Sequence, residues 1–226
     1  MDFKKTEIRF WRPVSSYSKV QHFVAHVIRN HRFHIDSALI QKKDYLDLGC
    51  GSNIHDSFVN LDYSWRPGID VCWDVTKGIP LTSQSVKGVF SEHCLEHLPF
   101  TSIRYVLSEC FRVLQKGGTL RIIVPDGELY LTKYTDIIRG QTATNLPYSQ
   151  NDAVEGLYGP IMSVNRIFRE HGHLFIYDFD ILNKLLVRQG FTSVKKESFM
   201  SGRDDRLLID SEHRAIESLY VEATKP

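Results

Sequence analysis

Residues 93–97 read His-Cys-Leu-Glu-His, a spacing of residue types that can bind a metal ion. Two histidines four positions apart on a helix can hold one zinc ion, and a glutamate between them can activate water. The pattern H-x-x-E-H also marks one class of zinc peptidases. A catalytic zinc site needs a third protein ligand, and nothing in the spacing of His171 or Glu128 singles either of them out.

The sequence around this motif argues against a peptidase. A short apolar strand predicted at 88–91 runs directly into it, and Pro99 disfavours helical geometry at Leu98. Any helix here is therefore limited to one or two turns, and matches to motifs of this length are often accidental. We expect Glu96 and His97 to be structural residues, and we expect no metal site.

A second group of residues that can do chemistry lies near position 50. The residues Asp47-Leu48-Gly49-Cys50-Gly51 end an apolar strand, and the glycines allow a tight turn and close approach of a ligand to the main chain. A dinucleotide site requires a third glycine where this chain has Ile54. A carboxylate at Asp47 would also repel a pyrophosphate, whereas it would attract a cationic ligand. S-adenosylmethionine is such a ligand, with an ammonium and a sulfonium group and no phosphate.

Carboxylates also lie at the ends of the next two predicted strands. Asp62 ends a strand at 59–62, and Asp74 ends a strand at 70–74. Because ligands of open α/β sheets bind outside the carboxyl ends of the strands, Asp47, Asp62 and Asp74 form a line that matches methionine, ribose and adenine. Aspartate is common at such positions as a turn or cap residue. Each position alone is therefore a weak signal, and the series with its glycines is a stronger one.

These segments resemble the class I S-adenosylmethionine-dependent methyltransferases, most closely the group that includes ubiquinone and menaquinone biosynthesis methyltransferases. The resemblance covers roughly residues 45–126 and continues more loosely through 171–191. It is carried by the segments LDLGCG (46–51), NLD (60–62), WDVTKGIPL (73–81), VFSEHCLEHLP (89–99) and ECFRVLQKGGTLRIIVPD (109–126).

The resemblance implies S-adenosylmethionine as the cofactor and a set of residues that contact it. These residues are Asp47, Gly49, Cys50, Gly51, Asn53, Asp62, Tyr63, Asp74, Val75, Ser91 and Glu92. The segment between the first two strands is shorter than usual in the family, so the helix that normally follows the glycine turn must be a single turn or missing. Asn53 also stands where many members have glycine, and Gly88 stands where many have aspartate.

Methyl transfer to oxygen requires a base as well as alignment. The leaving group is a neutral sulfur, so the enzyme mainly supplies orientation and a dry site. A hydroxyl acceptor still has to lose its proton, and histidine is the usual base near neutral pH. Candidate bases are His93, at the end of the fourth strand, and His171 and His173, with two glutamates as lesser candidates, Glu92 and Glu170. A polar loop before the next helix explains His171-Gly172-His173 equally well.

The elements that must position these residues alternate along the chain. Apolar periodicity predicts helices at 17–30, at 103–114 with Thr101 or Ser102 as cap and Gly117-Gly118 as stop, and at 178–189 after Asp178. Strands are predicted at 45–48, 59–62, 70–74, 88–91, 119–126, 191–199 and 218–223. We expect one α/β domain over 1–226, with a Rossmann-like, mostly parallel seven-stranded sheet, helices on both faces and an antiparallel last strand. Residues 1–40 are expected as an N-terminal helical segment and 127–177 as an insertion or lid over the carboxyl edge.

Composition excludes several classes of partner. The net charge is +1, and the sequence has no basic run. The motif after the fourth strand is SEHC, whereas nucleic-acid amino-methylases have an Asn/Asp-Pro-Pro-aromatic signature there. We therefore expect no nucleic-acid partner. No apolar run reaches membrane length, and the N-terminus lacks a signal-peptide hydrophobic region. The four cysteines have no C-x-x-C spacing, which indicates reduced thiols and a cytoplasmic location.

The acceptor is the least determined part of the prediction. The C-terminal pattern from 171 onward resembles methyltransferases found among bacterial polysaccharide and glycan biosynthesis proteins, which implies a sugar hydroxyl, and a small-molecule acceptor fits nearly as well. Aromatic residues that could line its pocket are Trp11, Tyr17, Tyr130, Tyr134, Tyr148 and Tyr158.

Two alternatives to a methyltransferase remain. One is a nicotinamide-dependent oxidoreductase, which is disfavoured by Asp47 and the missing third glycine, and the other is a non-catalytic cofactor-binding protein. Nothing in the sequence indicates an oligomeric state.

Overall fold

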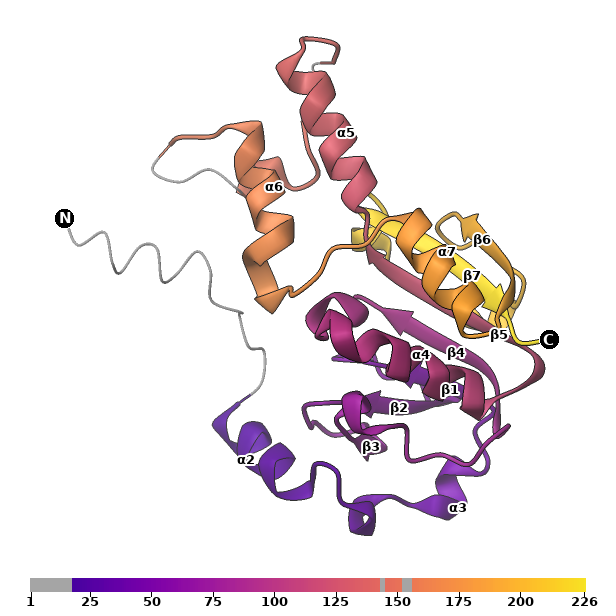
Figure 1. The fold of residues 1–226 in the computed structure, drawn as a ribbon. Helices are drawn as coiled ribbons and strands as arrows, with labels where there is room; N and C mark the ends of the chain where they lie inside the picture. The colour runs from indigo at the N-terminus through magenta and orange to yellow at the C-terminus, as the bar shows by residue number, and fades with distance from the viewer. Residues whose placement is uncertain (1–17, 143–144, 152–155) are drawn as a thin grey trace.

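A seven-stranded sheet organises the chain in a computed structural model that describes residues 18–142, 145–151 and 156–226 (Figure 1). The strand order is β3-β2-β1-β4-β5-β7-β6. The strands are β1 (Tyr45–Leu48), β2 (Phe58–Asp62), β3 (Val71–Cys72), β4 (Val86–Glu92), β5 (Leu114–Pro125), β6 (Thr192–Glu197) and β7 (Ser218–Thr224). β1 to β5 run parallel, and β7 is antiparallel to both β5 and β6. The predicted Rossmann-like sheet with its antiparallel last strand is confirmed.

The strand that precedes the glycine turn lies in the middle of this sheet. β1 pairs with β2 on one side and with β4 on the other, and all four of its residues are buried. A strand covered on both faces is expected to be apolar throughout, so the buried Asp47 within it is an exception that needs a function. No helix forms between β1 and β2, as the short spacing predicted.

One face of the sheet is covered by α4 (Phe100–Val113) and α7 (Phe179–Arg188). The apolar side chains of α4 recur at helical spacing and are all buried: Ile103, Val106, Leu107, Cys110 and Val113. Asp178 caps α7 as predicted, because its carboxylate accepts a hydrogen bond from the amide of Ile181 at 2.9 Å.

The predicted ends of α4 are wrong at both termini. The helix begins at Phe100 after Pro99, and neither Thr101 nor Ser102 caps it. It ends at Val113, and the chain continues directly into β5. Gly117-Gly118 therefore lies inside β5 and does not stop the helix. The two glycines are held there by the chain end, since Gly117 donates to the Lys225 carbonyl at 2.8 Å and Lys225 donates to the Gly118 carbonyl at 3.0 Å.

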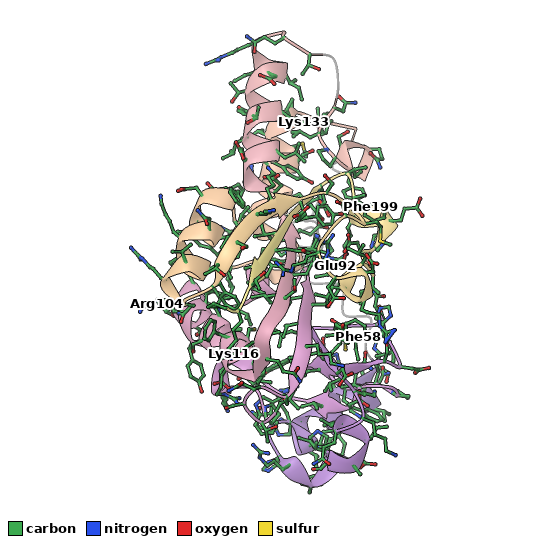
Figure 2. The ribbon with its side chains drawn as sticks, turned by 90° about the vertical axis from the view of Figure 1, so that its right-hand side faces the viewer. Phe58, Glu92, Arg104, Lys116, Lys133 and Phe199 are labelled. Atoms are coloured by element: carbon green, nitrogen blue, oxygen red, sulfur yellow. The ribbon has the colours of Figure 1, made fainter. Side chains whose placement is uncertain are left out.

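The opposite face is covered by the segment between β6 and β7, which we call the 198–217 link. It contains two short 3-10 helices, η6 (Asp205–Leu207) and η7 (Glu212–Arg214). Leu207 of the link packs with aromatic and aliphatic side chains of the sheet, namely Tyr45, Phe58, Phe90, Ile123 and Tyr220. Figure 2 shows Arg104 of α4 on one side of the sheet and Phe58, Glu92 and Phe199 on the other.

The described residues 127–142, 145–151 and 156–177 form a separate layer beyond the carboxyl end of β5 (Figure 1). Its elements are α5 (Gly127–Ile138), η4 (Ser149–Asn151), α6 (Pro160–Arg169) and η5 (Glu170–Gly172). α5 and α6 pack on each other through a small apolar cluster made of Tyr130, Leu146, Val164 and Ile167. None of the helices in the described ranges is long and apolar enough to cross a membrane.

The N-terminal segment lies beside the edge strand β3. Its elements are α2 (Lys19–Ile28), η1 (Arg32–His34) and α3 (Ser37–Ile40). The predicted helix at 17–30 is confirmed as α2, although Tyr17 and Trp11 lie outside the described residues. Asn30 and His34 attach the segment to Cys72, with N–O and N–N distances of 3.3 and 3.1 Å.

Candidate active site

A cavity of about 1240 Å³ opens at the carboxyl ends of β1, β2, β3 and β4. Most of the predicted cofactor contacts line it: Gly49, Cys50, Gly51, Asn53, Asp62, Tyr63, Asp74, Val75 and Glu92. Asp47 and Ser91 do not line it, because both are buried in the strands beneath. The three predicted bases, His93, His171 and His173, all line the same cavity. The fold thus brings the two groups of predicted residues together.

The glycine turn has the geometry that requires glycine. Gly49 and Gly51 have φ angles of 80° and 57°. The amides of Gly49 and Cys50 both donate to the Leu61 carbonyl, at 2.8 and 3.1 Å. A side chain at Gly49 would collide with the Sγ atom of Cys94, which belongs to the SEHC motif. The turn is therefore packed directly between the ends of β2 and β4.

Asp62 and Asp74 both face the cavity, but their hydrogen bonds differ. Asp62 accepts from the amide of Gly51 at 2.9 Å and from the amide of Ser64 at 2.7 Å, one bond to each oxygen. Asp74 accepts twice from Thr76, at 3.0 Å from its amide and 2.6 Å from its hydroxyl, and both bonds go to Oδ1. Within the described ranges no hydrogen bond reaches Oδ2 of Asp74, so this oxygen is available to a ligand.

Asp47 lies under the glycine turn and is 2% exposed. Burial raises the pKa of its carboxyl well above the ordinary value, and the nearby carboxylates of Glu92 and Asp62 raise it further. A positive group entering the cavity would relieve this repulsion. Carboxylates grouped in this way attract a cationic ligand more strongly than a phosphate.

Two predicted contacts position other parts of the protein. The Ser91 hydroxyl donates to the Leu48 carbonyl at 3.1 Å and links β4 to β1. The Glu92 carboxylate accepts from the amide and the hydroxyl of Ser211, at 2.9 and 2.5 Å, and so holds the 198–217 link at the cavity.

Tyr63 contacts the N-terminal segment. The guanidinium carbon of Arg29 lies 3.5 Å from the centroid of the Tyr63 ring, and its Nε donates to the Tyr63 carbonyl at 2.7 Å. The residue that follows α2 thus reaches the rim of the predicted ribose and adenine site.

The three candidate bases differ in their surroundings. The side chain of His93 is 6% exposed, and its Nε2 lies 2.8 Å from the Ser218 hydroxyl. Burial lowers the pKa of His93 well below its ordinary value, with Arg214 adding to the effect. Burial also lowers the pKa of His173, to about 4. Both rings are therefore neutral at pH 7. His171 is different, because half of its side chain is exposed.

The structure adds cavity residues that the sequence did not single out. His97, assigned a structural part from its motif, lines the cavity, and its ring centroid lies 4.9 Å from that of His173. The backbone carbonyl of the neighbouring Glu96 accepts from the amides of Leu174 and Phe175, at 2.7 and 3.2 Å. This bond pair places residues 93–97 against residues 171–175.

The far wall of the cavity comes from α6 and the 198–217 link. Arg166, Arg214 and Glu217 line it, and no pattern in the sequence had pointed to them. Of the four tyrosines predicted in the insertion, Tyr148 lines the cavity and donates from its hydroxyl to the His213 carbonyl. Tyr130 is buried between Glu217 and Arg166, each 2.7 Å from its hydroxyl. Tyr134 packs with the α5–α6 cluster, and Tyr158 lies 3.2 Å from the Ser163 hydroxyl.

Comparison with known proteins assigns the fold and the central segment. Residues 46–122 match the model of a family described as a methyltransferase domain. No curated protein sequence is significantly similar to this chain.

Solved structures resemble the chain at low sequence identity. An S-adenosylmethionine-dependent methyltransferase from Archaeoglobus fulgidus is 17% identical, with a TM-score of 0.50 over 100% of both chains. A possible histamine N-methyltransferase from Thermotoga maritima is 14% identical, with a TM-score of 0.49 over 99% of this chain and 96% of that one. Phosphoethanolamine N-methyltransferase 2 from Haemonchus contortus, in complex with S-adenosyl-L-methionine, is 13% identical, with a TM-score of 0.47 over 81% of this chain and 49% of that one.

The Archaeoglobus protein shares the fold of this chain, and the family match covers the strands that carry the glycine turn and the aspartates. Residues 46–122 thus match a methyltransferase domain, and the whole chain has the fold of the Archaeoglobus methyltransferase.

Proposed function

We propose that this enzyme transfers the methyl group of S-adenosylmethionine to a hydroxyl group of a small molecule or of a sugar or glycan. Transfer to nitrogen is the less favoured alternative. The observation that supports this proposal is that one cavity is lined both by strand-end carboxylates and by five histidine residues: His93, His97, His171, His173 and His213. A site with neutral histidines suits an acceptor that must lose a proton.

The cofactor is proposed to lie along the carboxyl ends of the strands. The methionine ammonium would face Asp47 and the glycine turn, the ribose hydroxyls would bind Asp62, and the adenine amino group would bind the free Oδ2 of Asp74. Asn53, Cys50 and Val75 would contact the cofactor by packing, since they line this half of the cavity. His93, His97, His171 and His173 line the same cavity, where the acceptor is proposed to bind.

The reaction is an in-line displacement at carbon. Bound S-adenosylmethionine would supply the methyl group: a lone pair of the acceptor oxygen would form the new O–C bond as the C–S bond broke, and the electron pair of that bond would stay on a neutral sulfur. The hydroxyl proton passes to a histidine nitrogen, and His93, His171 and His173 are the proposed bases. The protein aligns the reactants and excludes water, and the layer formed by 127–177 is proposed to be the lid that does so.

The setting of the reaction is also a proposal. Four free thiols suit a reducing compartment, which supports a cytoplasmic enzyme. The near-neutral charge supports a small or glycan acceptor over a nucleic acid. A place in polysaccharide biosynthesis follows from the C-terminal resemblance alone.

Calorimetric titration with S-adenosylhomocysteine, with NAD titrated separately, tests the cofactor site. We expect micromolar binding of the first compound and none of the second. Asp62→Ala should abolish that binding, whereas Asp44→Ala should not, because Asp44 is exposed and pairs with Lys87 at the surface. Binding of NAD, or unchanged binding in Asp62→Ala, would show that the strand-end carboxylates were misassigned.

A second experiment tests the acceptor class and the base. Radiolabelled methyl transfer is measured to a panel of sugars, phenols and amines, and the best acceptor is then used with His93→Ala, His171→Ala and His173→Ala. Hydroxyl compounds should accept and amines should not. At least one variant should lose most of its turnover while its affinity for S-adenosylhomocysteine is kept. Full turnover in all three would rule out a histidine base.

A further inference from the structure

Three side chains that can bind metal face one another at the histidine end of the cavity. Glu96, His97 and His173 each offer one ligand atom, and these atoms all lie within 4.8 Å of one another. The Oε1 atom of Glu96 is 3.9 Å from the Nε2 atom of His97. His173 comes from a distant part of the sequence and supplies the third ligand that the H-x-x-E-H motif lacks by itself.

The carboxylate of Glu96 is completely buried. Its side chain is 0% exposed, and neither oxygen has a hydrogen-bond partner among the residues that the structure describes. The nearest described basic nitrogen is Nδ1 of His93, 3.3 Å from Oε1. Burying a carboxylate is costly unless it is hydrogen-bonded, paired with a charge or bound to a metal ion. A buried carboxylate without a hydrogen bond, with the ring nitrogens of His93 and His97 as close neighbours, is therefore a favourable place for a cation.

The orientation of the His173 ring fits metal binding. Its Nδ1 atom lies 2.6 Å from the Ile167 carbonyl, which can only accept a hydrogen bond. Nδ1 must therefore carry the proton, and Nε2 is left with a free lone pair. Metal-binding histidines are typically fixed in this way, with the second ring nitrogen donating to a carbonyl or carboxylate.

The two segments that carry these ligands are held together independently of any metal. The Glu96 carbonyl accepts from the amides of Leu174 and Phe175, and the His97 ring lies against the backbone of His171 and Gly172. Arg214 places positive charge nearby, which opposes cation binding. The second nearby arginine, Arg166, is neutralised by Glu217 and Glu170, whose carboxylates lie 3.8 and 3.9 Å from its guanidinium nitrogens. The two segments that carry the ligands are thus joined before an ion arrives.

We propose that Glu96, His97 and His173 bind one divalent transition-metal ion, with zinc as the best match to two imidazoles and one carboxylate. Zinc commonly takes three protein ligands of these types and leaves one position for water or substrate. His97 and His173 line the cavity, so the open position faces the space where the acceptor is proposed to bind.

A metal ion here has a chemical consequence for the proposed reaction. Zinc lowers the pKa of a bound water or hydroxyl, so an acceptor hydroxyl on the open position would lose its proton more readily. His173 would then be a ligand, and His93 and His171 would be the bases left to accept the proton. This consequence rests on the proposed function, whereas the metal site itself does not.

Cobalt(II) is a suitable probe, because its visible absorption reports coordination. The full chain is prepared without a histidine tag, stripped of metal with a chelator and titrated with cobalt, and metal bound after dialysis is measured by elemental analysis. We expect one tightly bound ion per chain, with the intense bands of a four- or five-coordinate site. His97→Ala and His173→Ala should each weaken binding at least tenfold. His213→Ala is the matched control, because His213 lines the same cavity outside the ligand group.

The outcomes separate the metal site from the fold and from the cofactor site. Glu96→Gln keeps the shape of the side chain, and it should weaken cobalt binding while titration with S-adenosylhomocysteine is unchanged. No stoichiometric binding by the native chain would overturn the metal site, and so would an equal loss in His213→Ala. Cobalt binding without S-adenosylhomocysteine binding would leave the metal site standing and remove the proposed cofactor site.

Discussion

Arg121 and Asp210 form a buried ion pair, with Nε 2.8 Å from Oδ1 and Nη2 2.5 Å from Oδ2. Arg121 belongs to β5 and Asp210 to the 198–217 link, and neither side chain is exposed. Nη1 of Arg121 also lies 2.9 Å from Glu222 and 2.9 Å from the Ser201 carbonyl. The arginine thus fixes the link on the face of the sheet that lacks long helices. From this position the link reaches the cavity through Arg214 and Glu217.

Arg121→Met should lower the free energy of unfolding by about 3–5 kcal/mol, because it leaves two buried carboxylates without their partner. The change is measured by urea denaturation followed by circular dichroism. Lys87→Met is the matched control: Lys87 pairs with Asp44 at 2.7 Å, but both side chains are more than half exposed. An exposed pair contributes about 0–1 kcal/mol, so this variant should be nearly as stable as the native chain. Equal destabilisation of the two variants would contradict a structural role for Arg121.

Gly49→Ala should impair both stability and cofactor binding. The residue has φ +80°, and a Cβ atom would collide with Cys94, so the glycine turn has to move. Gly140→Ala is the control, because Gly140 has φ +68° with no atom near its added Cβ. It should show only the left-handed strain, about 1–2 kcal/mol. We expect Gly49→Ala to weaken binding of S-adenosylhomocysteine more than tenfold and Gly140→Ala to leave it unchanged, as measured by calorimetry. Native affinity in Gly49→Ala would mean that the turn does not contact the cofactor.

Arg29→Ala should weaken cofactor binding if the N-terminal segment closes this end of the cavity. The variant removes the stacking on Tyr63 and the hydrogen bond to its carbonyl. Together these contacts are worth about 1 kcal/mol, which corresponds to a roughly fivefold rise in Kd. Arg32→Ala is a nearby control in η1. The two variants are compared in the same calorimetric titration with S-adenosylhomocysteine, and indistinguishable Kd values would show that Arg29 has no part in the site.

The proposed cofactor-binding residues could be predicted because each of their motifs spans only a few consecutive residues. A glycine turn after a buried strand, and aspartates at successive strand ends, are recognisable from a few neighbouring residues. The sheet itself determines that Asp62 and Asp74 share one edge, because parallel strands end together. Their placement around one cavity therefore follows from short patterns and strand direction.

The other half depends on contacts between distant segments. Arg121 interrupts an apolar strand, and its partner Asp210 lies 89 positions further along in a polar segment without periodicity. Likewise, no spacing rule connects His97 with His173, which meet because the Glu96 carbonyl binds the backbone at 174–175. The ends of α4 were mispredicted for a similar reason, since Gly117-Gly118 is held by the chain terminus at Lys225.

The buried thiols give a pH dependence that can be measured without an acceptor. Burial is the main cause that raises the pKa of Cys72, to about 11, from the value of 9.0 expected without burial. Because the thiolate is the reactive form, a raised pKa lowers reactivity below that pH. At pH 8 the thiolate fraction of Cys72 falls to about one in a thousand, against about one in ten for an unperturbed thiol, so alkylation should be about 100-fold slower.

Iodoacetamide labelling followed by mass spectrometry measures this rate at Cys72 in the native chain and in urea. The native rate should also rise about tenfold per pH unit between 8 and 10, as long as the fold is intact. Equal rates in native and unfolded chains at pH 8 would contradict the burial of Cys72 between β2 and the N-terminal segment.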